Sequence, residues 1–484
     1  MSNETLSRRS FLKQVAAVSA GVALTGVALS SPQEAQAKTK SKGVITPNYP
    51  KGKVRVACVG VGARGREVVK GLHATGLCDI VILCDTDMGT EPTAIAEELC
   101  PKAKKFRDFR EMFDKACNEF DAVAVSTPDH AHFPITMLAM MNGKHVYVEK
   151  PLARTFEECE LLMAAEKKYG VVTQMGNQGH SGENYYQFKS FKEKGVLKDV
   201  RSITAHMNNV RRWHKWDPNM QSFPAAEPMP STLDWDTWLG TRAFHEYNKD
   251  FVRGQWRCWY DFGMGTLGDW GAHLIDTLHE FLELGLPTEI DPVYLKDHNP
   301  FFYPMSSSID FKFAARKDMP ECVINWKDGL DNLPTLPAGY GESVIDKDIP
   351  TVAGEAFVPT TLSPGRVVYA DGLIMKGGSH GTPLSIVSGE RGNDFKKHVD
   401  DYVKDQPDCF TDFLVACQGK GKTNSPFSVS GPLSQVFCLG VIAQRLNTKL
   451  IFDPATKTVT NNSLANEMLR GSMPRAGWEK YYQI

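Results

Sequence analysis

Residues 54–65 decide the fold: Val54-Arg55-Val56-Ala57-Cys58-Val59 is followed directly by Gly60-Val61-Gly62-Ala63-Arg64-Gly65. The first six residues form a short β-branched run, which predicts a buried strand. The glycines suit a turn from that strand into a helix. Gly60 permits the tight turn, Gly62 permits close backbone approach of a ligand, and Gly65 lets helix and strand pack closely. Because the N-terminus of such a helix offers free N–H groups to phosphate, the stretch predicts a dinucleotide-binding unit.

Strands and helices alternate from this stretch onward, which predicts a doubly wound parallel sheet of the Rossmann type over residues 53–177. The later strands are expected at 79–85, 121–126, 145–148 and 171–174. The helices between them are expected at 66–74, 93–99, 109–116, 133–142 and 156–169.

The second predicted strand ends in Asp85, where an acidic residue of this fold takes the adenosine ribose hydroxyls. A carboxylate there repels a 2′-phosphate, so NAD is favoured over NADP. Two alternatives stay open. Arg64 lies close enough in sequence to the glycine turn to bind the 2′-phosphate of NADP. Asp87 could take the place of Asp85 as the acid that binds the ribose.

Polar residues also follow the next two strands, at the carboxyl edge where ligands bind in such sheets. Ser126-Thr127-Pro128 ends one strand, with His130 and His132 just behind it, and Glu149-Lys150-Pro151 ends the next. A lysine there can donate a hydrogen bond to a substrate hydroxyl and help move its proton. The plainer interpretations are a solvated loop lysine and ordinary helix-start or surface histidines.

The second half of the chain has a different pattern, which predicts an α+β domain over 178–484 with a large, mainly antiparallel open sheet. Longer strands are expected at 201–208, 307–313 and 321–326, with helices at 274–284 and 433–446. Residues 332–382 are Pro/Gly-rich and weakly periodic, so we expect a peripheral, loop-rich insertion there.

The N-terminal segment carries the twin-arginine export signature Ser7-Arg8-Arg9-Ser10-Phe11-Leu12-Lys13. An apolar run from Val15 to Leu29 follows, shorter than the ~20 residues that span a bilayer. Ala35-Gln36-Ala37 supplies small residues for cleavage. Residues 1–37 are therefore expected to be a Tat signal peptide and 38–52 a linker. The mature chain is expected to be periplasmic, without stable membrane insertion. The alternative to a signal peptide is that this N-terminal segment forms a short amphipathic helix.

Charge and cysteine content exclude several classes of function. The chain has 484 residues and a net charge of −2, so no basic surface predicts a nucleic-acid partner. Its eleven cysteines form no C-x-x-C pair and no zinc-like spacing. We therefore expect no metal site and mostly buried thiols.

These motifs together resemble the Gfo/Idh/MocA oxidoreductases, in particular an exported bacterial branch often labelled inositol-dehydrogenase-like. The resemblance covers roughly residues 54–453. It rests on Gly60–Gly65, Asp85, Ser126–His132, Gly143–Pro151, Gly176-Asn177-Gln178, Trp256-Arg257, Gly265–His273 and Ser430–Leu433.

The resemblance implies a nicotinamide cofactor, NAD or NADP, a carbohydrate substrate, and a homo-oligomer (dimer or tetramer) formed through the second sheet. It implies that Lys150, Asp269 and His273 are catalytic. It also implies a set of cofactor-binding residues: Gly60, Gly62, Ala63, Arg64, Gly65, Asp85, Ser126, Thr127, Pro128, His130, His132, Glu149, Lys150, Asn177, Trp256 and Arg257.

Residue spacing supports part of this set independently. Asp269 and His273 are four residues apart, so on a helix they share a face, where a carboxylate can raise the basicity of an imidazole. The plainer alternative is that Asp269 caps the helix and His273 packs in the core. The Arg257 guanidinium could bind a phosphate or carboxylate, or form an ordinary surface ion pair.

The function expected from these features is hydride transfer between a nicotinamide and a hydroxyl or ketone carbon of a sugar, glycoside or polyol, with NAD either exchanged or tightly held and recycled. The first alternative is an NAD-dependent glycosidase that works by oxidation, elimination, hydration and reduction. Exported enzymes of that kind often depart from the E-K-P motif, which is intact here. The second alternative, a non-catalytic sugar-binding protein, is disfavoured by the presence of Lys150 and His273.

Overall fold

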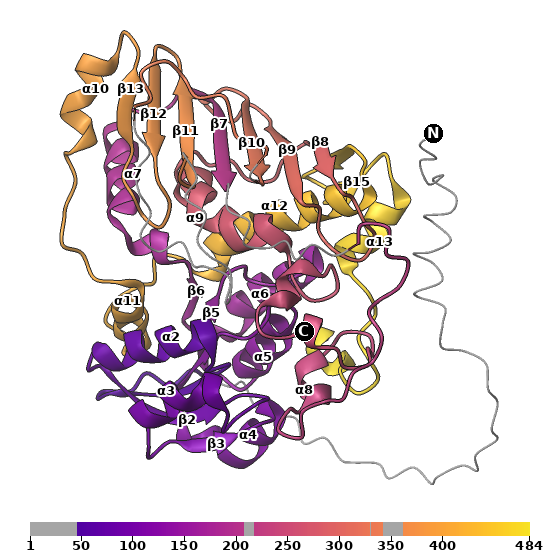
Figure 1. Cartoon of the computed structure of the whole chain (residues 1–484). Coiled ribbons are helices and arrows are strands. Elements are labelled where there is room, and N and C mark those ends of the chain that lie inside the picture. Colours follow the sequence, from indigo (N-terminus) through magenta and orange to yellow (C-terminus); the bar gives the residue numbers. More distant parts are fainter. Residues whose placement is uncertain (1–45, 208–216, 330, 342–361) are drawn as a thin grey trace. The chain divides into compact units, whose positions relative to one another are not determined.

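The computed structural model describes residues 46–207, 217–329, 331–341 and 362–484. The predicted signal peptide and residues 38–45 of the predicted linker lie outside this part of the chain. Two β-sheets, with helices between and around them, make up the described fold (Figure 1).

The first sheet has six parallel strands in the order β3-β2-β1-β4-β5-β6, as expected for a Rossmann domain. Its strands are β1 (Val54–Val59), β2 (Cys78–Cys84), β3 (Lys104–Phe106), β4 (Ala122–Val125), β5 (His145–Glu149) and β6 (Thr173–Gly176). Its helices are α2 (Ala63–Ala74), α3 (Ala94–Leu99), α4 (Phe109–Ala116), α5 (Asp129–Met141) and α6 (Phe156–Tyr169).

Strand register brings the predicted ligand-binding residues to one edge of this sheet. Val59 at the end of β1 pairs with Cys84 of β2 and with Val125 of β4. Because these strands are parallel, the residues that follow them, Gly60, Asp85 and Ser126, emerge side by side. β1 is central and almost fully buried, which explains its continuous apolar sequence.

The second sheet has nine strands and is mainly antiparallel, with β7 and β10 as a parallel pair. The predicted fold class is therefore confirmed. In spatial order the strands are β13 (Ser385–Ser388), β12 (Leu373–Gly377), β11 (Gly365–Ala370), β7 (Val200–Met207), β10 (Cys322–Asp328), β9 (Ser306–Phe313), β8 (Glu289–Lys296), β14 (Leu450–Asp453) and β15 (Thr458–Val459).

Helices α9 (Gly265–Phe281) and α12 (Phe427–Leu446) lie between the two sheets (Figure 1). α12 packs on α6, α9 and β8, so the two sheets share one apolar core. α12 is also long and apolar enough to cross a membrane, but 83% of its most apolar window is buried inside the protein, as in a core helix. The other helices are α7 (Glu183–Lys194), α8 (Trp235–Leu239), α10 (Gly392–Val399), α11 (Cys409–Cys417) and α13 (Ser463–Arg470).

α9 begins nine residues before the start expected at residue 274. Its first seven residues include Gly265, Gly268 and Gly271, and glycine is a poor helix former. Packing overrides that preference, since a Cβ at Gly271 would lie only 2.6 Å from the Phe437 ring of α12. Asp269 therefore lies inside the helix and does not cap it.

The expectation of a loop-rich insertion at 332–382 is wrong for its last part, because 365–377 forms the hairpin of β11 and β12 inside the sheet. β11 also pairs with β7. The sequence contains the signal for this hairpin: Asp371-Gly372 joins two apolar runs, and Gly372 has φ +66°. The proline- and glycine-rich residues before it obscured that signal.

Candidate active site

The glycine turn after β1 has the geometry of a phosphate cradle. Gly60 has φ +78°, and a Cβ there would lie 2.8 Å from the backbone of Ser126 and Thr127. A Cβ at Gly65 would lie 1.9 Å from the Gly60 carbonyl oxygen. Gly62 precedes α2, which has no side-chain cap and no acidic residue in its first turn, and Ala63 begins it. The first N–H groups of α2 are thus in a setting that suits an anion.

Asp85 holds this turn in place. Its Oδ2 accepts hydrogen bonds from the N–H groups of Val61 (2.9 Å) and Gly62 (3.3 Å), and its Oδ1 from that of Asp87 (3.0 Å). Burial raises the pKa of Asp85, and these three bonds oppose the rise. Asp87 Oδ1 is buried and has no hydrogen-bond partner among the described residues, so both acids stay candidates for a ribose hydroxyl.

Arg64 points from the glycine turn toward β5, where its guanidinium pairs with Glu149 at 3.0 Å. Tyr147 donates a second hydrogen bond to the same carboxylate oxygen, at 3.2 Å. The Glu149 side chain is 6% exposed, so the Arg64 charge is neutralised inside the protein. The Arg64–Glu149 pair therefore connects the glycine turn after β1 to the end of β5.

The loop after β4 contains Ser126, Thr127 and Pro128. Thr127 Oγ1 is buried without a hydrogen-bond partner in the described structure, as is Asn177 Oδ1 after β6. Buried polar atoms are normally satisfied, so these two oxygens suit hydrogen-bond donors of a bound polar ligand. Together with the glycine cradle, they show that the residues present fit a dinucleotide.

The two histidines of α5, His130 and His132, are buried, and their ring nitrogens contact backbone carbonyl oxygens. His132 lies 2.8 Å from the Pro151 oxygen and 2.9 Å from the Thr127 oxygen, so it ties together the loops after β4 and β5. His130 lies 2.6 Å from the Trp238 oxygen, and burial lowers its pKa to about 3. These contacts give both histidines structural roles, and the cofactor contacts that the family resemblance implies for them stay a prediction.

Lys150 lies at the centre of the site, immediately after β5. Its Nζ donates to the Asp269 carbonyl oxygen at 2.6 Å and to Asp269 Oδ1 at 2.8 Å. Arg257 donates to the same Oδ1 at 3.3 Å, and its guanidinium lies 4.1 Å from the centre of the Trp256 ring. The Lys150 and Asp269 side chains are only 11% and 8% exposed. The carboxylate thus holds two cations at the edge of the Rossmann sheet.

Asp129, at the start of α5, is a site residue that our sequence reasoning missed. Its Oδ2 accepts a hydrogen bond from the Met264 N–H at 3.1 Å, which ties α5 to the residue before α9. Burial raises the pKa of Asp129, while the neighbouring His132, Arg257 and Lys150 favour its ionised form. The sequence signal was present, since Asp129 lies in the Ser126–His132 motif.

His273 follows Asp269 by one helical turn, and its ring stacks on that of His380, with centroids 3.8 Å apart. Trp270 contacts both imidazoles edge-on. His380 belongs to the loop after β12, within the segment that we expected to be peripheral. The structure therefore adds a second histidine to the site, next to one of the predicted catalytic residues.

The same face of α9 continues with Asp276 and Glu280, which hold His180 between them. His180 follows β6, is fully buried, and contacts Asp276 through Nδ1 and Glu280 through Nε2 at 2.8 Å. Burial alone would lower the pKa of His180, but the two carboxylates outweigh it and raise the pKa to about 10. This ionic cluster joins the end of the Rossmann domain to α9.

Comparison with known proteins identifies the two domains. Residues 54–177 match the Gfo/Idh/MocA oxidoreductase family, NAD-binding Rossmann fold, and residues 186–295 match its C-terminal alpha/beta domain. These two domains belong to the Gfo/Idh/MocA oxidoreductase family. The NAD-binding Rossmann domain of this family thus contains the glycine cradle, and its second domain contains Arg257, Asp269 and His273.

Curated relatives of the chain include an alpha-N-acetylgalactosaminidase from Shewanella oneidensis. It is 33% identical over 226 residues, which are 44% of this chain and 48% of the relative. A glycosyl hydrolase family 109 protein from Shewanella pealeana is 33% identical over 223 residues, 43% of this chain and 47% of the relative. The match thus spans about half the length of these relatives.

Solved structures share the fold. The WlbA dehydrogenase from Bordetella pertussis, in complex with NADH and UDP-GlcNAcA, is 14% identical with a TM-score of 0.54, covering 83% of this chain and 99% of its own. Levoglucosan dehydrogenase in complex with NADH and L-sorbose is 15% identical with a TM-score of 0.52, covering 82% and 98%. At these identities the likeness extends to the fold of both domains.

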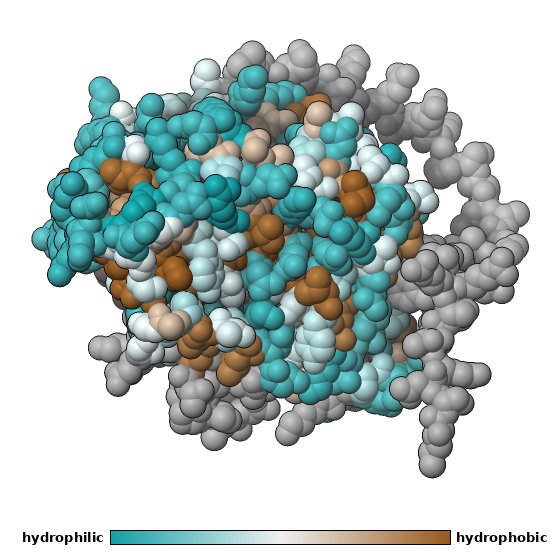
Figure 2. Space-filling view, turned by 90° about the horizontal axis from the view of Figure 1, so that it is seen from above, coloured by the Kyte–Doolittle hydropathy of each residue, from teal (hydrophilic) through white to brown (hydrophobic). Residues whose placement is uncertain are grey.

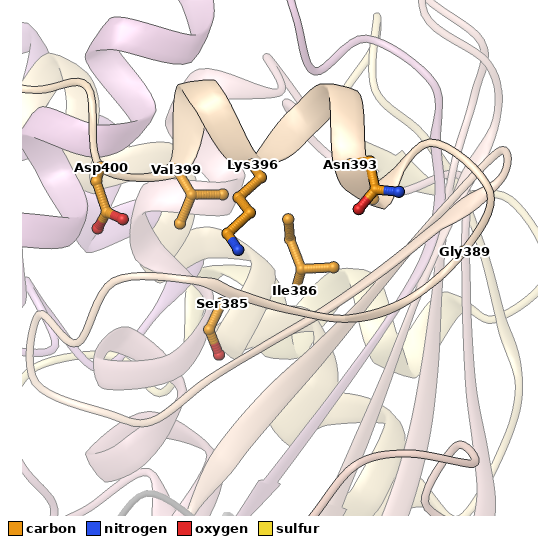
Figure 3. A pocket seen from close by; sticks show the side chains of 8 residues that line it. Ser385, Ile386, Gly389, Asn393, Lys396, Val399 and Asp400 are labelled. Atoms are coloured by element: carbon orange, nitrogen blue, oxygen red, sulfur yellow. The ribbon is translucent and has the colours of Figure 1, made fainter.

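A separate hollow of about 450 Å³ lies between β13 and α10, at the edge of the second sheet (Figure 3). Lys396 and Asp400 are the charged residues among those that line it, and no histidine or cysteine accompanies them. Among the described residues, no group of three His, Cys, Asp or Glu side chains could hold a metal ion.

Proposed function

We propose that this Gfo/Idh/MocA protein transfers hydride between bound NAD and a hydroxyl-bearing carbon of a sugar, glycoside or polyol. The observation that carries the proposal is the position of Lys150. Lys150 lies at the carboxyl edge of the Rossmann sheet, and its Nζ is 2.8 Å from Asp269 Oδ1. Asp269 in turn lies one helical turn before His273 on α9. This arrangement places proton-transfer groups beside the edge where the family binds its cofactor.

When bound, NAD supplies the hydride acceptor. The chain supplies the proton chemistry: Lys150 donates a hydrogen bond to the substrate hydroxyl oxygen, and the hydroxyl proton passes to whichever of His273 and Lys150 is in its neutral form as the carbon is oxidised. Asp269 holds Lys150 in position, and Arg257 shares that carboxylate. In the reverse direction the same groups return the proton to a carbonyl oxygen.

We propose NAD as the preferred cofactor, with NADP disfavoured. Asp85 presents a buried carboxylate at the end of β2, which repels a 2′-phosphate. Arg64, the cation that could have compensated, is paired with Glu149 at 3.0 Å. Both features disfavour binding of the 2′-phosphate of NADP.

A second candidate is an NAD-dependent glycosidase, which the alpha-N-acetylgalactosaminidase relative favours. Its chemistry starts with the same oxidation of a sugar hydroxyl. The resulting ketone acidifies the neighbouring C–H bond, the glycosidic oxygen leaves by elimination, water adds, and the ketone is reduced again. Lys150 and His273 serve the first and last steps equally well, so the two candidates differ in the fate of the glycosidic bond.

One assay separates the two candidates. The purified mature protein is mixed with nitrophenyl glycosides, including the α-N-acetylgalactosaminide, and with free sugars and myo-inositol. Nitrophenol release and the absorbance of reduced nicotinamide are followed together. We expect net reduction of added NAD by a free sugar or polyol, without nitrophenol release.

Nitrophenol release without net reduced nicotinamide would establish the glycosidase instead. Hydride exchange between two sugars, without net reduction, would indicate an oxidoreductase that recycles tightly held NAD. Sugar binding without either reaction would contradict both enzymatic proposals and leave a binding protein.

We also propose that the chain belongs to the exported, inositol-dehydrogenase-like branch of the family and works in the periplasm. The support is the sequence Ser7–Lys13 with its paired arginines. Replacing Arg8 and Arg9 together by lysine is expected to leave the protein in the cytoplasm, because the twin-arginine system reads both arginines. Cell fractionation with immunoblotting checks this, and the Lys13→Arg variant is the control. Unchanged export of the double variant would contradict the assignment.

We propose that the protein forms a dimer or tetramer through its second sheet, as the family resemblance implies. On β8, Val293 and Tyr294 are exposed (55% and 40%). Seen from above, the molecule shows several small apolar patches separated by hydrophilic residues (Figure 2). Light scattering of the purified protein measures the assembly directly.

A further inference from the structure

The loop after β12 brings His380 against the predicted catalytic His273. The two imidazole rings are nearly parallel, at 27°, and Ser379 Oγ lies 2.6 Å from His380 Nδ1. His273 is buried (6% exposed), whereas His380 is partly exposed. A ligand that reaches this pair from the solvent side therefore meets His380 before His273.

A buried arginine holds this loop in place. Arg366 of β11 is 1% exposed and donates to the Gly378 oxygen at 3.0 Å and to the Thr382 oxygen at 2.9 Å. These two carbonyl groups bracket His380. The same guanidinium lies 3.5 Å from the His273 carbonyl oxygen on α9. Arg366 thus fixes the loop and the helix relative to each other, and it acts as a positioning residue.

The segment that follows β6 also holds the loop. The Asn184 N–H donates to the Gly381 oxygen at 3.0 Å. A Cβ at Gly182 would lie 2.9 Å from Gly381 Cα, and one at Gly179 would lie 3.0 Å from Gly381 N. The loop therefore packs tightly against the segment that follows β6, at the junction of the two domains.

The backbone at His380 is itself unusual. It has φ +49°, in the left-handed region that non-glycine residues adopt at a cost, and Gly381 beside it has φ +92°. A glycine at residue 380 would adopt this conformation without that cost. Strained positions of this kind cluster at functional sites, so the conformation points to a use for the imidazole.

We propose that His380 is a further substrate-binding residue that hydrogen-bonds a sugar hydroxyl and so sets which hydroxyl pattern the site accepts. Its ring forms one wall of the sugar site together with His273 and Trp270. This inference rests on the proposed function. It assigns specificity to a residue of the loop after β12, whereas Lys150, Asp269 and His273 serve the proton transfer.

The test compares wild-type protein with His380→Ala and His380→Asn. Probes are methyl glucoside, methyl galactoside, myo-inositol and singly deoxygenated analogues of whichever of these reacts fastest. Asparagine tolerates the left-handed backbone and keeps the loop intact if alanine does not. His398→Ala, on α10, is the matched control. Thermal unfolding and the Kd for NAD are measured for each variant.

We expect both variants to lower kcat/KM by about 10–100-fold with little change in NAD affinity, because a substrate hydroxyl loses its partner. One deoxygenated analogue, much poorer than its parent for the wild type, should become equivalent to the parent in the variants. His398→Ala should behave like wild type.

If every deoxygenated analogue suffers the same relative loss in the variants as in the wild type, His380 contacts no substrate hydroxyl and the inference is wrong. A kcat/KM within about threefold of wild type, less than one ordinary hydrogen bond is worth, would also overturn it. Failure of the wild type to react with any probe is a different result: it contradicts the proposed function, and the inference with it.

Discussion

Replacing Lys150 by alanine is expected to lower kcat by about 10²–10⁴-fold, the usual contribution of a positioned acid–base group. Lys150 follows β5, and its Nζ donates to Asp269 Oδ1; its removal takes away the group that is proposed to bind the substrate hydroxyl and to take part in its proton transfer. Binding of NAD should remain measurable, weakened by at most about tenfold, because the glycine cradle is untouched. Steady-state kinetics and NAD titration measure the two effects separately.

Lys144 provides the matched control because it lies at the opposite end of the same strand. Its Nζ donates to the Phe120 oxygen at 2.9 Å, away from the carboxyl edge. Lys144→Ala should therefore retain the kcat of the wild type. Equal kcat for Lys150→Ala and wild type would remove Lys150 from the proposed chemistry.

Replacing His180 by glutamine is expected to destabilise the protein by about 3 kcal/mol, the lower end of the cost of breaking a buried ion pair. The neutral amide would leave the carboxylates of Asp276 and Glu280 without their cation. The Asp276 side chain is 6% exposed and that of Glu280 is 26% exposed. Water can therefore partly solvate the Glu280 carboxylate, which lowers the cost of losing its cation. Chemical denaturation at neutral pH measures the change in the free energy of unfolding.

The same residue predicts how stability depends on pH. The pKa of His180 is raised from 6.5 to about 10 in the folded protein. Because folding favours the protonated form, this contribution is fully present below about pH 6.5 and is lost as the pH rises toward 10. The wild type should therefore lose more stability than His180→Gln over that range.

His73→Gln, at an exposed position of α2, serves as the control and should change stability by less than about 0.5 kcal/mol. Parallel stability–pH curves for wild type and His180→Gln would contradict the ionic role of His180. An unchanged free energy of unfolding at neutral pH would contradict it as well.

Features encoded by local sequence were predictable. The run from Val54 to Gly65 specified strand, turn and helix in twelve consecutive residues, and the structure has β1 and α2 at that place. Lys150 follows β5 directly, so a parallel sheet places it at the ligand-binding edge in any version of this fold.

Features that depend on distant parts of the chain were not predictable. His380 reaches His273 because β11 pairs with β7 and Arg366 ties the loop to α9, contacts between segments far apart in sequence. The carbonyl partners of His130 are a second example. Its ring lies against the backbone oxygens of Trp238 and Phe262, residues more than a hundred positions away. The sequence around His130 does not predict contacts with residues so far away in the chain.

The proposed hydride transfer requires a nicotinamide dinucleotide that lies across the turn of Gly60, Gly62 and Gly65. Native mass spectrometry of the purified mature chain, mixed with NAD, tests this directly because it detects both retained and added cofactor. We predict one dinucleotide per chain, whether carried through purification or taken up from solution. A chain that carries none, and takes up neither NAD nor NADP at saturating concentration, would contradict the account.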